Sequence, residues 1–182
     1  MNLHKATERT HVLIEQLLTN ARVQEDCQLG TVNVSIKELL RNLLEDLLPL
    51  IDSKAITISV IGQDIEVASE PIDLQVLIKN IIDNAIKYSP QNGLIDIILN
   101  GNEPTEIIIK DNGPGIPVTD QLRVFDPFYR VPGNHEFGSG LGLSIVRTIA
   151  TRLGLTIELC NNSDQSGLSM KVIFPKNDNH KK

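Results

Sequence analysis

The sequence predicts an α+β fold, in which antiparallel strands form one layer and helices cover one face of them in a second layer. Segments whose apolar residues recur every three or four positions, as in helices, alternate with short segments of β-type alternation. Most of the β-type segments come in pairs around a short polar turn, which is the pattern of a β-hairpin. The chain has 182 residues and is 41% hydrophobic, so it is large enough to bury one substantial core.

The first 24 residues are predicted to form a helix that needs a partner. Small and apolar side chains recur along it at coiled-coil spacing: Leu3, Ala6, Thr10, Leu13, Leu17 and Ala21. A helix of this length is marginal in water by itself, so its seam calls for a second helix that this sequence does not contain. His4 and His11 lie beside the seam, and we interpret them as solvated or seam-edge side chains, since a reactive histidine needs an acidic neighbour and a site.

The next predicted helix begins after a short edge strand at 32–34. Ser35 is a favoured N-cap residue, and Glu38 three positions later completes a capping box. One face of this helix is apolar without interruption: Ile36, Leu39, Leu40, Leu43, Leu44, Leu47, Leu48 and Ile51.

Two hairpins are predicted before and after a further helix. Alternation at 56–61 and 65–68, on either side of a Gly-Gln-Asp turn, predicts the first hairpin. Pro71 then suits the first turn of a helix with a long buried face: Leu74, Leu77, Ile78, Ile81, Ile82, Ala85 and Ile86. Strands at 94–99 and 106–110 form the second hairpin.

The last part of the domain contains a long irregular segment. Residues 117–139 combine Pro, Gly and polar residues with little periodicity, and an irregular stretch of that length is usually a functional lid. A helix at 143–153 and a pair of strands at 156–160 and 168–174 complete the fold. The chain thus divides into a partial helical region, a polar linker, a globular domain and a disordered tail, at 1–24, 25–31, 32–176 and 177–182.

Two glycine-rich segments are the first candidates for a binding site. Asp111-Asn112-Gly113-Pro114-Gly115-Ile116-Pro117 follows a predicted strand, which places a carboxylate at the start of a glycine loop. Gly138-Ser139-Gly140-Leu141-Gly142 opens the last helix, where backbone amides favour phosphate. Each segment alone is more often a plain tight turn. Their order and spacing predict the two ends of a nucleotide, with Asp111 accepting a hydrogen bond from an adenine amino group.

Two asparagines on the helix that starts at Pro71 are the second candidate. Asn80 and Asn84 are four residues apart and share one helix face, with Lys87 and Tyr88 one turn further on. Asparagine is a poor helix-interior residue, which is explained if its amide carbonyl coordinates Mg²⁺ beside nucleotide phosphates. Lys87 would then neutralise phosphate charge. A solvated polar face explains the same residues and stays open at this point.

The few aromatic side chains gather around these segments. Five of the six lie in or beside them, and only Phe174 does not: Tyr88, Phe125, Phe128, Tyr129 and Phe137. A core would scatter them, so the clustering supports a site, although they can equally be anchors that hold a loop down. Arg130 is either a solvated charge or a phosphate contact.

Composition and motif context argue against several other classes. The formal charge of −6 argues against nucleic acid as a partner, since a nucleic-acid binder shows a basic face. No apolar run approaches the ~20 residues that span a bilayer, and no signal peptide opens the chain. Cys27 and Cys160 lack metal-ligand spacing. The glycines at 138–142 follow a loop rather than a strand, so they are no Rossmann fingerprint, and Walker A and protein-kinase signatures are absent.

Taken together, the four segments resemble the catalytic, ATP-binding domain of bacterial sensor histidine kinases, within the gyrase, heat-shock-90, histidine kinase and MutL superfamily. The matching segments are similar to the N, G1, F and G2 boxes of that domain, in this order: Asn80–Ser89, Asp111–Pro117, Phe125–Arg130 and Gly138–Gly142. The match covers roughly residues 32–175, and its motifs are specific. It implies the Bergerat-type ATP-binding fold, with 117–139 as the ATP lid.

The resemblance also implies roles for individual residues. Asn84 is expected to be a Mg²⁺ ligand, Asn80 a metal or phosphate contact, and Asp111 the carboxylate that reads adenine; with Lys87, the two asparagines are the expected catalytic residues. The expected contacts to ATP or ADP are Asn80, Asn84, Lys87, Tyr88, Asp111, Gly113, Gly115, Ile116, Phe125, Arg130, Ser139, Gly140, Leu141, Gly142 and Leu143. Hydrolytic relatives carry a glutamate at the position of Asn80. Asparagine cannot take a proton, which favours phosphotransfer over hydrolysis.

Residues 1–24 resemble the second helix of the family's dimerisation and phosphoacceptor hairpin, but the phosphoacceptor box is absent. Neither His4 nor His11 is followed by the acidic residue and the Arg/Lys-Thr-Pro pattern of that box. We therefore expect a C-terminal fragment whose own phosphoacceptor helix, with the substrate histidine, lies upstream of Met1. The resemblance implies relay of the ATP γ-phosphoryl through that histidine to an aspartate of a response regulator. It further implies a homodimeric full-length protein in the bacterial inner membrane, of which this chain is a cytoplasmic domain.

Two other interpretations stay open. An ATPase clamp like gyrase or MutL would turn over ATP rapidly without a partner, but Asn80 and the helical N-terminal seam speak against it. A nucleotide-binding regulator without kinase activity would leave a supplied phosphoacceptor hairpin unphosphorylated, and the intact motifs speak against that interpretation.

Overall fold

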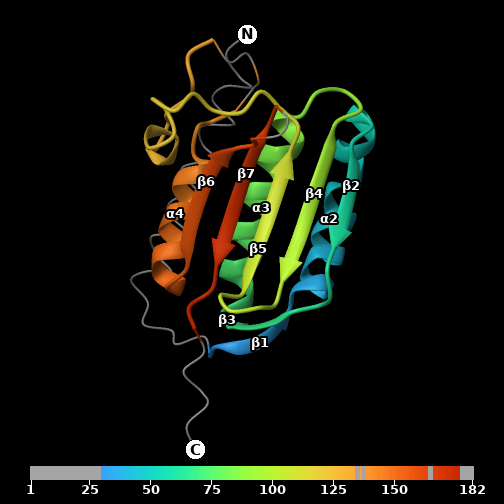
Figure 1. The fold of residues 1–182 in the computed structure, drawn as a ribbon, viewed down its shortest axis with the longest axis vertical. Helices are drawn as coiled ribbons and strands as arrows, with labels where there is room; N and C mark the ends of the chain where they lie inside the picture. The colour runs from blue at the N-terminus through green and yellow to red at the C-terminus, as the bar shows by residue number, and fades with distance from the viewer. Residues whose placement is uncertain (1–29, 134–135, 137, 164–165, 177–182) are drawn as a thin grey trace, which may run out of the picture.

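The structure is a computed structural model, and it describes residues 30–133, 136, 138–163 and 166–176 (Figure 1). In chain order its elements are β1 (Val32–Ser35), α2 (Ile36–Lys54), β2 (Thr57–Ile61), β3 (Glu66–Ser69), α3 (Pro71–Tyr88), β4 (Leu94–Asn100), β5 (Glu106–Asp111), the 3-10 turn η1 (Arg123–Phe125), α4 (Gly142–Leu153), β6 (Thr156–Asn161) and β7 (Leu168–Ile173). The helix expected at 1–24 and the tail at 177–182 lie outside the described residues.

A five-stranded sheet and three helices form two layers. The strand order is β2-β4-β5-β7-β6, and α2, α3 and α4 lie together on one face of this sheet, behind it in Figure 1. The core fills the space between the layers, and the sheet contributes these buried side chains to it: Ile95, Ile97, Leu99, Ile107, Ile109, Met170 and Val172. The predicted α+β sandwich is confirmed.

The central helix, α3, is fixed at its start by its cap and along its length by burial. Pro71 occupies its first turn, as predicted, and the Glu70 carboxylate accepts hydrogen bonds from the amides of Ile72 (3.2 Å) and Asp73 (2.5 Å). Every member of the predicted buried face is at most 4% exposed: Leu74, Leu77, Ile78, Ile81, Ile82, Ala85 and Ile86. Each large side chain buried in this way stabilises the fold by roughly 1.5–3 kcal/mol, so the position of α3 on the sheet is firmly set.

The C-terminal turn of α3 is held by a lysine from the neighbouring helix. The Lys54 ammonium, at the end of α2, donates hydrogen bonds to the carbonyl oxygens of Lys87 (2.5 Å) and Ser89 (3.2 Å). A cation satisfies the last carbonyls of a helix and interacts favourably with its dipole. The turn that carries Lys87 and Tyr88 is therefore fixed from outside.

The hairpin predicted at 56–61 and 65–68 is wrong. β2 pairs in parallel with β4 in the main sheet, whereas β3 pairs antiparallel with β1 in a separate two-stranded sheet. The main sheet is accordingly mixed, and β2 and β4 are joined through β3 and α3, as a crossover between parallel strands requires.

The cause lies in the segment that was expected to be a turn. The Asp64 carboxylate accepts hydrogen bonds from Ser35 Oγ (2.7 Å) and from the backbone amide of Lys37 (2.9 Å), at the start of α2. The bond from Lys37, followed by that from Ser35, holds the pKa of Asp64 below its usual range. This anchoring carries the chain across to β1 instead of turning it back along β2.

α2 begins as expected but buries less than its sequence pattern indicated. Ser35 is its N-cap, with Oγ accepting a hydrogen bond from the amide of Glu38 (3.2 Å). Five of the eight predicted positions are buried: Ile36, Leu39, Leu40, Leu43 and Leu47. Leu48 is 50% exposed, so the predicted uninterrupted face is wrong at that residue.

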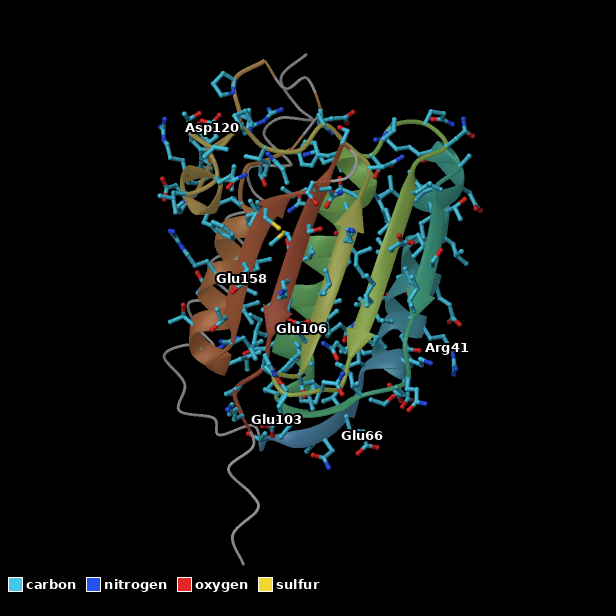
Figure 2. The ribbon with its side chains drawn as sticks, in the orientation of Figure 1. Arg41, Glu66, Glu103, Glu106, Asp120 and Glu158 are labelled. Atoms are coloured by element: carbon cyan, nitrogen blue, oxygen red, sulfur yellow. The ribbon has the colours of Figure 1, made fainter. Side chains whose placement is uncertain are left out.

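The face of the sheet away from the helices carries charged side chains among apolar ones. Lys171 of β7 lies 3.3 Å from Glu106 and 3.7 Å from Glu158, and both glutamates lie on the open face (Figure 2). The hydrogen bond to Glu106 raises the pKa of Lys171 above its usual value. No helix among the described residues is both long and apolar enough to cross a membrane.

Candidate functional site

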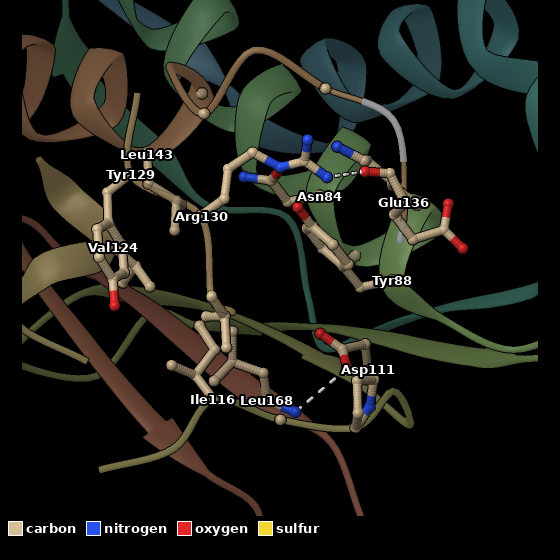
Figure 3. A pocket seen from close by; sticks show the side chains of 18 of the residues that line it. Asn84, Tyr88, Asp111, Ile116, Val124, Tyr129, Arg130, Glu136, Leu143 and Leu168 are labelled. Atoms are coloured by element: carbon tan, nitrogen blue, oxygen red, sulfur yellow. Dashed lines mark hydrogen bonds between the residues drawn. The ribbon is translucent and has the colours of Figure 1, made fainter. Parts of the chain in front are cut away.

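A cavity of about 660 Å³ lies at the end of the sheet where β5 and α3 terminate and α4 begins. Three segments close it: the loop after β5, described residues of the expected lid segment at 117–139, and the start of α4 (Figure 3). Its size is in the range of pockets that hold small ligands. Most of the residues predicted to contact nucleotide line it: Asn80, Asn84, Lys87, Tyr88, Asp111, Gly115, Ile116, Arg130, Ser139, Gly140, Gly142 and Leu143.

Asn80 and Asn84 form one wall of the cavity, on α3. The Asn80 Nδ2 donates a hydrogen bond to the carbonyl of Val76 (2.8 Å), one turn back. The amide oxygen of Asn80 takes no part in this hydrogen bond. The Asn84 side chain forms no hydrogen bond to another described residue. Gly142 at the start of α4 faces both amides, because a Cβ there would lie 3.2 Å from Asn80 Oδ1 and 3.3 Å from Asn84 Nδ2. Two amide oxygens are thus presented beside a helix start.

The donor set tells which ions this wall can hold. The described residues contain no group of three or more His, Cys, Asp or Glu side chains arranged to bind a metal. The neutral oxygens of Asn80 and Asn84 fit Mg²⁺, which is usually held by few protein ligands together with phosphates and water.

Positive charge lies one turn beyond the asparagines. The Lys87 ammonium lies 4.9 Å from the centre of the Tyr88 ring, and no described carboxylate pairs with it. Both residues line the cavity. Lys87 therefore supplies a cation that is available to an anionic ligand, whereas the neighbouring Lys54 is engaged with the α3 carbonyls.

Asp111, the last residue of β5, lies at the other end of the cavity and is 7% exposed (Figure 3). Its Oδ1 accepts hydrogen bonds from the amides of Gly113 (2.8 Å) and Leu168 (3.2 Å). Burial raises the pKa of Asp111 above its usual value, and the two amide hydrogen bonds act in the opposite direction. Oδ2 accepts no hydrogen bond from the described residues, so it is the oxygen available to a ligand.

The floor of the cavity near Asp111 is apolar. The apolar side chains that line it belong to the hydrophobic core or pack against it: Ile81, Ala85, Ile109, Leu168 and Met170. Of these, the sequence analysis assigned Ile81 and Ala85 to the buried face of their helix. A flat apolar ring fits such a surface when a carboxylate at its edge is available to pair with a ring amino group.

Three predicted nucleotide contacts do not line the cavity. Gly113 packs against the end of α3, where a Cβ would lie 2.7 Å from the Tyr88 carbonyl, and its amide donates the hydrogen bond to Asp111. Phe125 packs against the hydrophobic core, and Leu141 is buried at 2% exposed. Apolar side chains at these two positions hold the lid and the start of α4 in place.

The described residues of the lid segment have little regular structure beyond η1. Tyr129 lies in it, with its hydroxyl donating to Asp120 Oδ1 (2.5 Å) and its ring under the Arg123 guanidinium (4.3 Å). The hydrogen bond to Asp120 raises the pKa of Tyr129. Arg130 lines the cavity and donates to the backbone carbonyl of Glu136 (Figure 3).

One group of residues at the site was missed from the sequence. The turn between β6 and β7, with Asn161, Asn162 and Ser166, hydrogen-bonds the loop that follows Asp111. The only signal was an Asn-Asn pair before a Ser-Gly, which is typical of many turns. Its contact with a segment 45–53 positions earlier is not visible in any local pattern.

The family relationship agrees with this geometry. Residues 69–178 match the family of histidine kinase-, DNA gyrase B- and HSP90-like ATPases, which is more than half of the chain. The chain therefore belongs to this ATPase family, and it is homologous to sensor histidine kinases over their C-terminal catalytic region.

Particular relatives make the relationship specific. The sensor protein QseC of Escherichia coli O157:H7 is 35% identical over 175 residues, which cover 94% of this chain and 38% of that protein. The solved cytoplasmic segment of histidine kinase QseC superposes with a TM-score of 0.66 at 27% identity, covering 93% of this chain and 95% of that one. Histidine kinase ThkA, solved with the response regulator protein TrrA, reaches a TM-score of 0.74 at 20% identity, covering 98% of this chain and 50% of that one, and this likeness concerns the fold alone. The chain spans about two fifths of QseC.

Proposed function

We propose that this chain binds ATP together with Mg²⁺ and is the catalytic domain of a sensor histidine kinase. The observation that carries the proposal is the placing of Asp111 and of the α3 asparagines at two ends of one cavity of about 660 Å³. An adenine ring on the apolar floor would donate its amino group to Asp111, and its phosphates would reach the asparagine wall. Homology with sensor histidine kinases supports the kinase assignment.

In the proposed complex each side chain has a separate task. Asp111 Oδ2 accepts the hydrogen bond that selects adenine. Bound Mg²⁺ supplies positive charge beside the phosphates, and the amide oxygens of Asn84 and Asn80 are the ligands that would hold it. Lys87 adds a cation at the phosphate end, and the backbone amides at the start of α4 provide a dipole that favours negative charge. Arg130 is placed to act from the lid.

The proposed reaction is transfer of the γ-phosphoryl group to a histidine outside this chain. An imidazole nitrogen is itself the nucleophile, so the domain needs to position and neutralise rather than to activate water. Asn80 cannot accept a proton, and its amide is oriented by the hydrogen bond that Nδ2 donates to the Val76 carbonyl. These features favour transfer over hydrolysis.

The remaining assignments follow from the kinase proposal. We place a partial phosphoacceptor hairpin at 1–24, a linker at 25–31 and the catalytic domain at 32–176. The partners are then the phosphoacceptor helix, a second copy in the full-length protein, and a response regulator receiver domain. The domain would act on the cytoplasmic side of a membrane-anchored sensor.

Calorimetric titration of the chain with Mg-ADP, Mg-ATP and Mg-GTP tests the binding part. We expect both adenine nucleotides to bind, GTP to bind much more weakly, and a chelator to weaken binding. A well-folded sample without affinity for adenine nucleotides in magnesium would contradict the proposal.

The kinase part needs a second experiment, with a supplied phosphoacceptor hairpin and Mg-ATP. We expect a phosphohistidine on the hairpin and slow ATP turnover without it. Rapid turnover by the chain alone would favour an ATPase clamp, and a hairpin left unphosphorylated despite tight ATP binding would favour a regulator.

A further inference from the structure

The loop that follows Asp111 is held by hydrogen bonds from the turn between β6 and β7. We use the name β6–β7 turn for its described residues: Asn161, Asn162, Ser163, Ser166 and Gly167. The side chain of Ser166 donates a hydrogen bond to the carbonyl of Gly113 (2.6 Å), and that of Asn162 donates to the carbonyl of Asp111 (2.8 Å). The first half of the loop is thereby tied to this turn.

The second half is held by one amide. Asn161 Oδ1 accepts a hydrogen bond from the Ile116 amide (2.8 Å), and Asn161 Nδ2 donates one to the Ile116 carbonyl (2.8 Å). The side chain thus pairs with both backbone groups of one residue, as a neighbouring strand would. Between Pro114 and Ile116, the only other described side chain that hydrogen-bonds the loop backbone is Gln121, to the same carbonyl at 3.3 Å.

The close approach of this amide also constrains the loop sequence. Gly115 has a φ of +73°, and a Cβ there would lie 2.7 Å from Asn161 Oδ1. Glycine is needed both for the positive φ and for the space that the amide occupies. Asn161 itself is exposed and makes no contribution to the core, so packing of the fold does not explain its position.

We propose that Asn161 is a positioning residue for recognition of the base. Ile116 forms one side of the pocket and Asp111 lies at its end. The backbone of both residues is hydrogen-bonded to side chains of the β6–β7 turn. By fixing Ile116, the Asn161 amide sets where the ring lies, and therefore whether its amino group meets the Asp111 carboxylate at hydrogen-bond distance. The proposal rests on the proposed ATP-binding function and adds a residue that acts through Ile116 without touching ligand.

Ligand selectivity is the measurement that distinguishes a positioning role of Asn161 from a general contribution to stability. A hydrogen bond weakens steeply with poor distance or angle, whereas apolar contact with the ring tolerates small shifts. A loosened loop therefore loses discrimination for the amino group before it loses the ring. Contacts at the phosphate end, which belong to α3 and α4, are left intact.

The experiment compares three ligands on the full chain with Mg²⁺: ATP, purine riboside triphosphate, which lacks the amino group, and inorganic triphosphate, which lacks the base. For the unchanged chain we expect ATP to bind roughly 10- to 100-fold more tightly than purine riboside triphosphate, the worth of a hydrogen bond to a charged group. In Asn161→Ala we expect this ratio to fall by about threefold or more, the size of a coupling between contacting groups. Affinity for inorganic triphosphate should not change.

A matched control is Asn100→Ala, at the opposite end of the sheet. The Asn100 side chain also makes two hydrogen bonds, from Nδ2 to Glu106 (3.0 Å) and from the Asn102 amide to its Oδ1 (3.1 Å), but it lies far from the cavity lining. It should keep the ATP ratio of the unchanged chain. Asn161→Asp, which retains the acceptor for the Ile116 amide and loses the donor to its carbonyl, should give an intermediate ratio.

The outcomes are distinct. An unchanged ratio in Asn161→Ala, or an equal loss of affinity for all three ligands, overturns the positioning role while the proposed function stands. If Asn161→Ala does not fold, Asn161→Asp decides, and a ratio equal to that of the unchanged chain overturns the role. Failure of the unchanged chain to bind ATP overturns both proposals.

Discussion

The two ends of the cavity differ in how firmly the protein holds them. At the Asp111 end, the carboxylate is 7% exposed and accepts two backbone hydrogen bonds, and the following loop is clasped by the β6–β7 turn. At the lid end, three large apolar side chains face solvent: Val118 at 80%, Leu122 at 85% and Phe128 at 61% exposed. Val124 and Phe125 anchor this segment to the buried interior, and its other contacts include surface pairs such as Asp126 with Arg147 at 3.5 Å, a kind of pair worth only about 0–1 kcal/mol.

This difference indicates which half of the site is ordered before a ligand binds. The base end belongs to the stable part of the fold, because it is formed by the ends of β5, β6 and β7. Apart from Val124 and Phe125, the described lid residues are exposed or half-buried, and segments of that kind are the ones that open and close around ligands. We therefore expect ligand discrimination to depend on the base end and ligand-induced ordering to occur at the lid end.

The largest effect is expected at the phosphate end, from Asn84→Ala. Loss of a group that only supports a metal ligand commonly costs 10- to 100-fold in affinity, so loss of a direct ligand should cost at least about 100-fold in magnesium-dependent ATP affinity. Titration with and without a chelator measures it. The control Asp83→Ala breaks only the Lys79–Asp83 pair on the same helix and should keep ATP affinity. Unchanged affinity in Asn84→Ala would remove the assignment of Asn84 as a ligand.

The base end is tested by Asp111→Asn. The amide retains an oxygen for the Gly113 amide but presents an NH₂ group to the adenine amino group, so ATP affinity should fall roughly 10- to 100-fold. GTP affinity should not fall in parallel. Equal weakening of both nucleotides would point to a damaged loop instead of lost recognition.

The same variant makes a prediction about stability and pH. Because burial raises the pKa of Asp111 above its usual 3.8, its ionisation costs folding free energy. The stability contribution of Asp111 is fully present below pH 3.8 and is lost as pH rises through the raised pKa. The free energy of unfolding of Asp111→Asn, relative to the unchanged chain, should therefore increase from acid to neutral pH in the absence of nucleotide. Urea unfolding of both proteins across that range measures it, and a difference that falls with rising pH would contradict the assigned shift.

A smaller effect is expected where α3 and α4 meet, from Gly142→Ala. The added Cβ lies 3.2 Å from Asn80 Oδ1, which displaces the asparagine wall, and crowding of this size costs about 1–3 kcal/mol. We expect about a tenfold loss of ATP affinity. Stability should change little, because alanine is the better helix former by about 1 kcal/mol. Gly30→Ala, at a glycine with nothing within 4 Å of a Cβ, is the control, and equal behaviour of the two variants would exclude crowding.

The smallest effect is expected in the lid, from Leu122→Ser. This side chain is 85% exposed, so its replacement should change the free energy of unfolding by less than about 0.5 kcal/mol. Val124→Ala, in the same segment but only 7% exposed, should cost more. Chemical unfolding of both variants compares them. A larger loss in Leu122→Ser would mean that the lid is packed more firmly than its exposure indicates.

Local features of this chain were predictable from sequence. The apolar period of α3 gave its buried face in full, because a helix that packs on a sheet must repeat its apolar side chains every three or four residues. The same period made Asn80 and Asn84 conspicuous, and chain order then placed Asp111 and the glycines of 138–142 at one site. Twelve of the fifteen expected nucleotide contacts line the cavity.

Pairings between distant segments were not predictable. β2 alternates in the same way whether it pairs with β3 or with β4, and the observed pairing is accompanied by a contact between Asp64 and Ser35, across 29 positions. The hydrogen bonds between Asn161 and Ile116 join residues that are 45 positions apart. Whether Phe125 and Leu141 are buried depends on how the lid and α4 pack in the folded chain. Their positions in the motifs do not show this, so both were predicted to contact the ligand.

The parallel pairing of β2 with β4 has a consequence for the way the chain reaches its native state. Thr57 lies opposite Leu94, and Ile61 lies opposite Ile98. β2 and β4 can therefore pair only by closing a loop that contains β3 and α3. Closing such long loops costs chain entropy before any contact repays it, and a high mean sequence separation of contacts slows folding. The edge strand β2 should accordingly acquire protection from amide exchange later than the hairpin of β4 and β5.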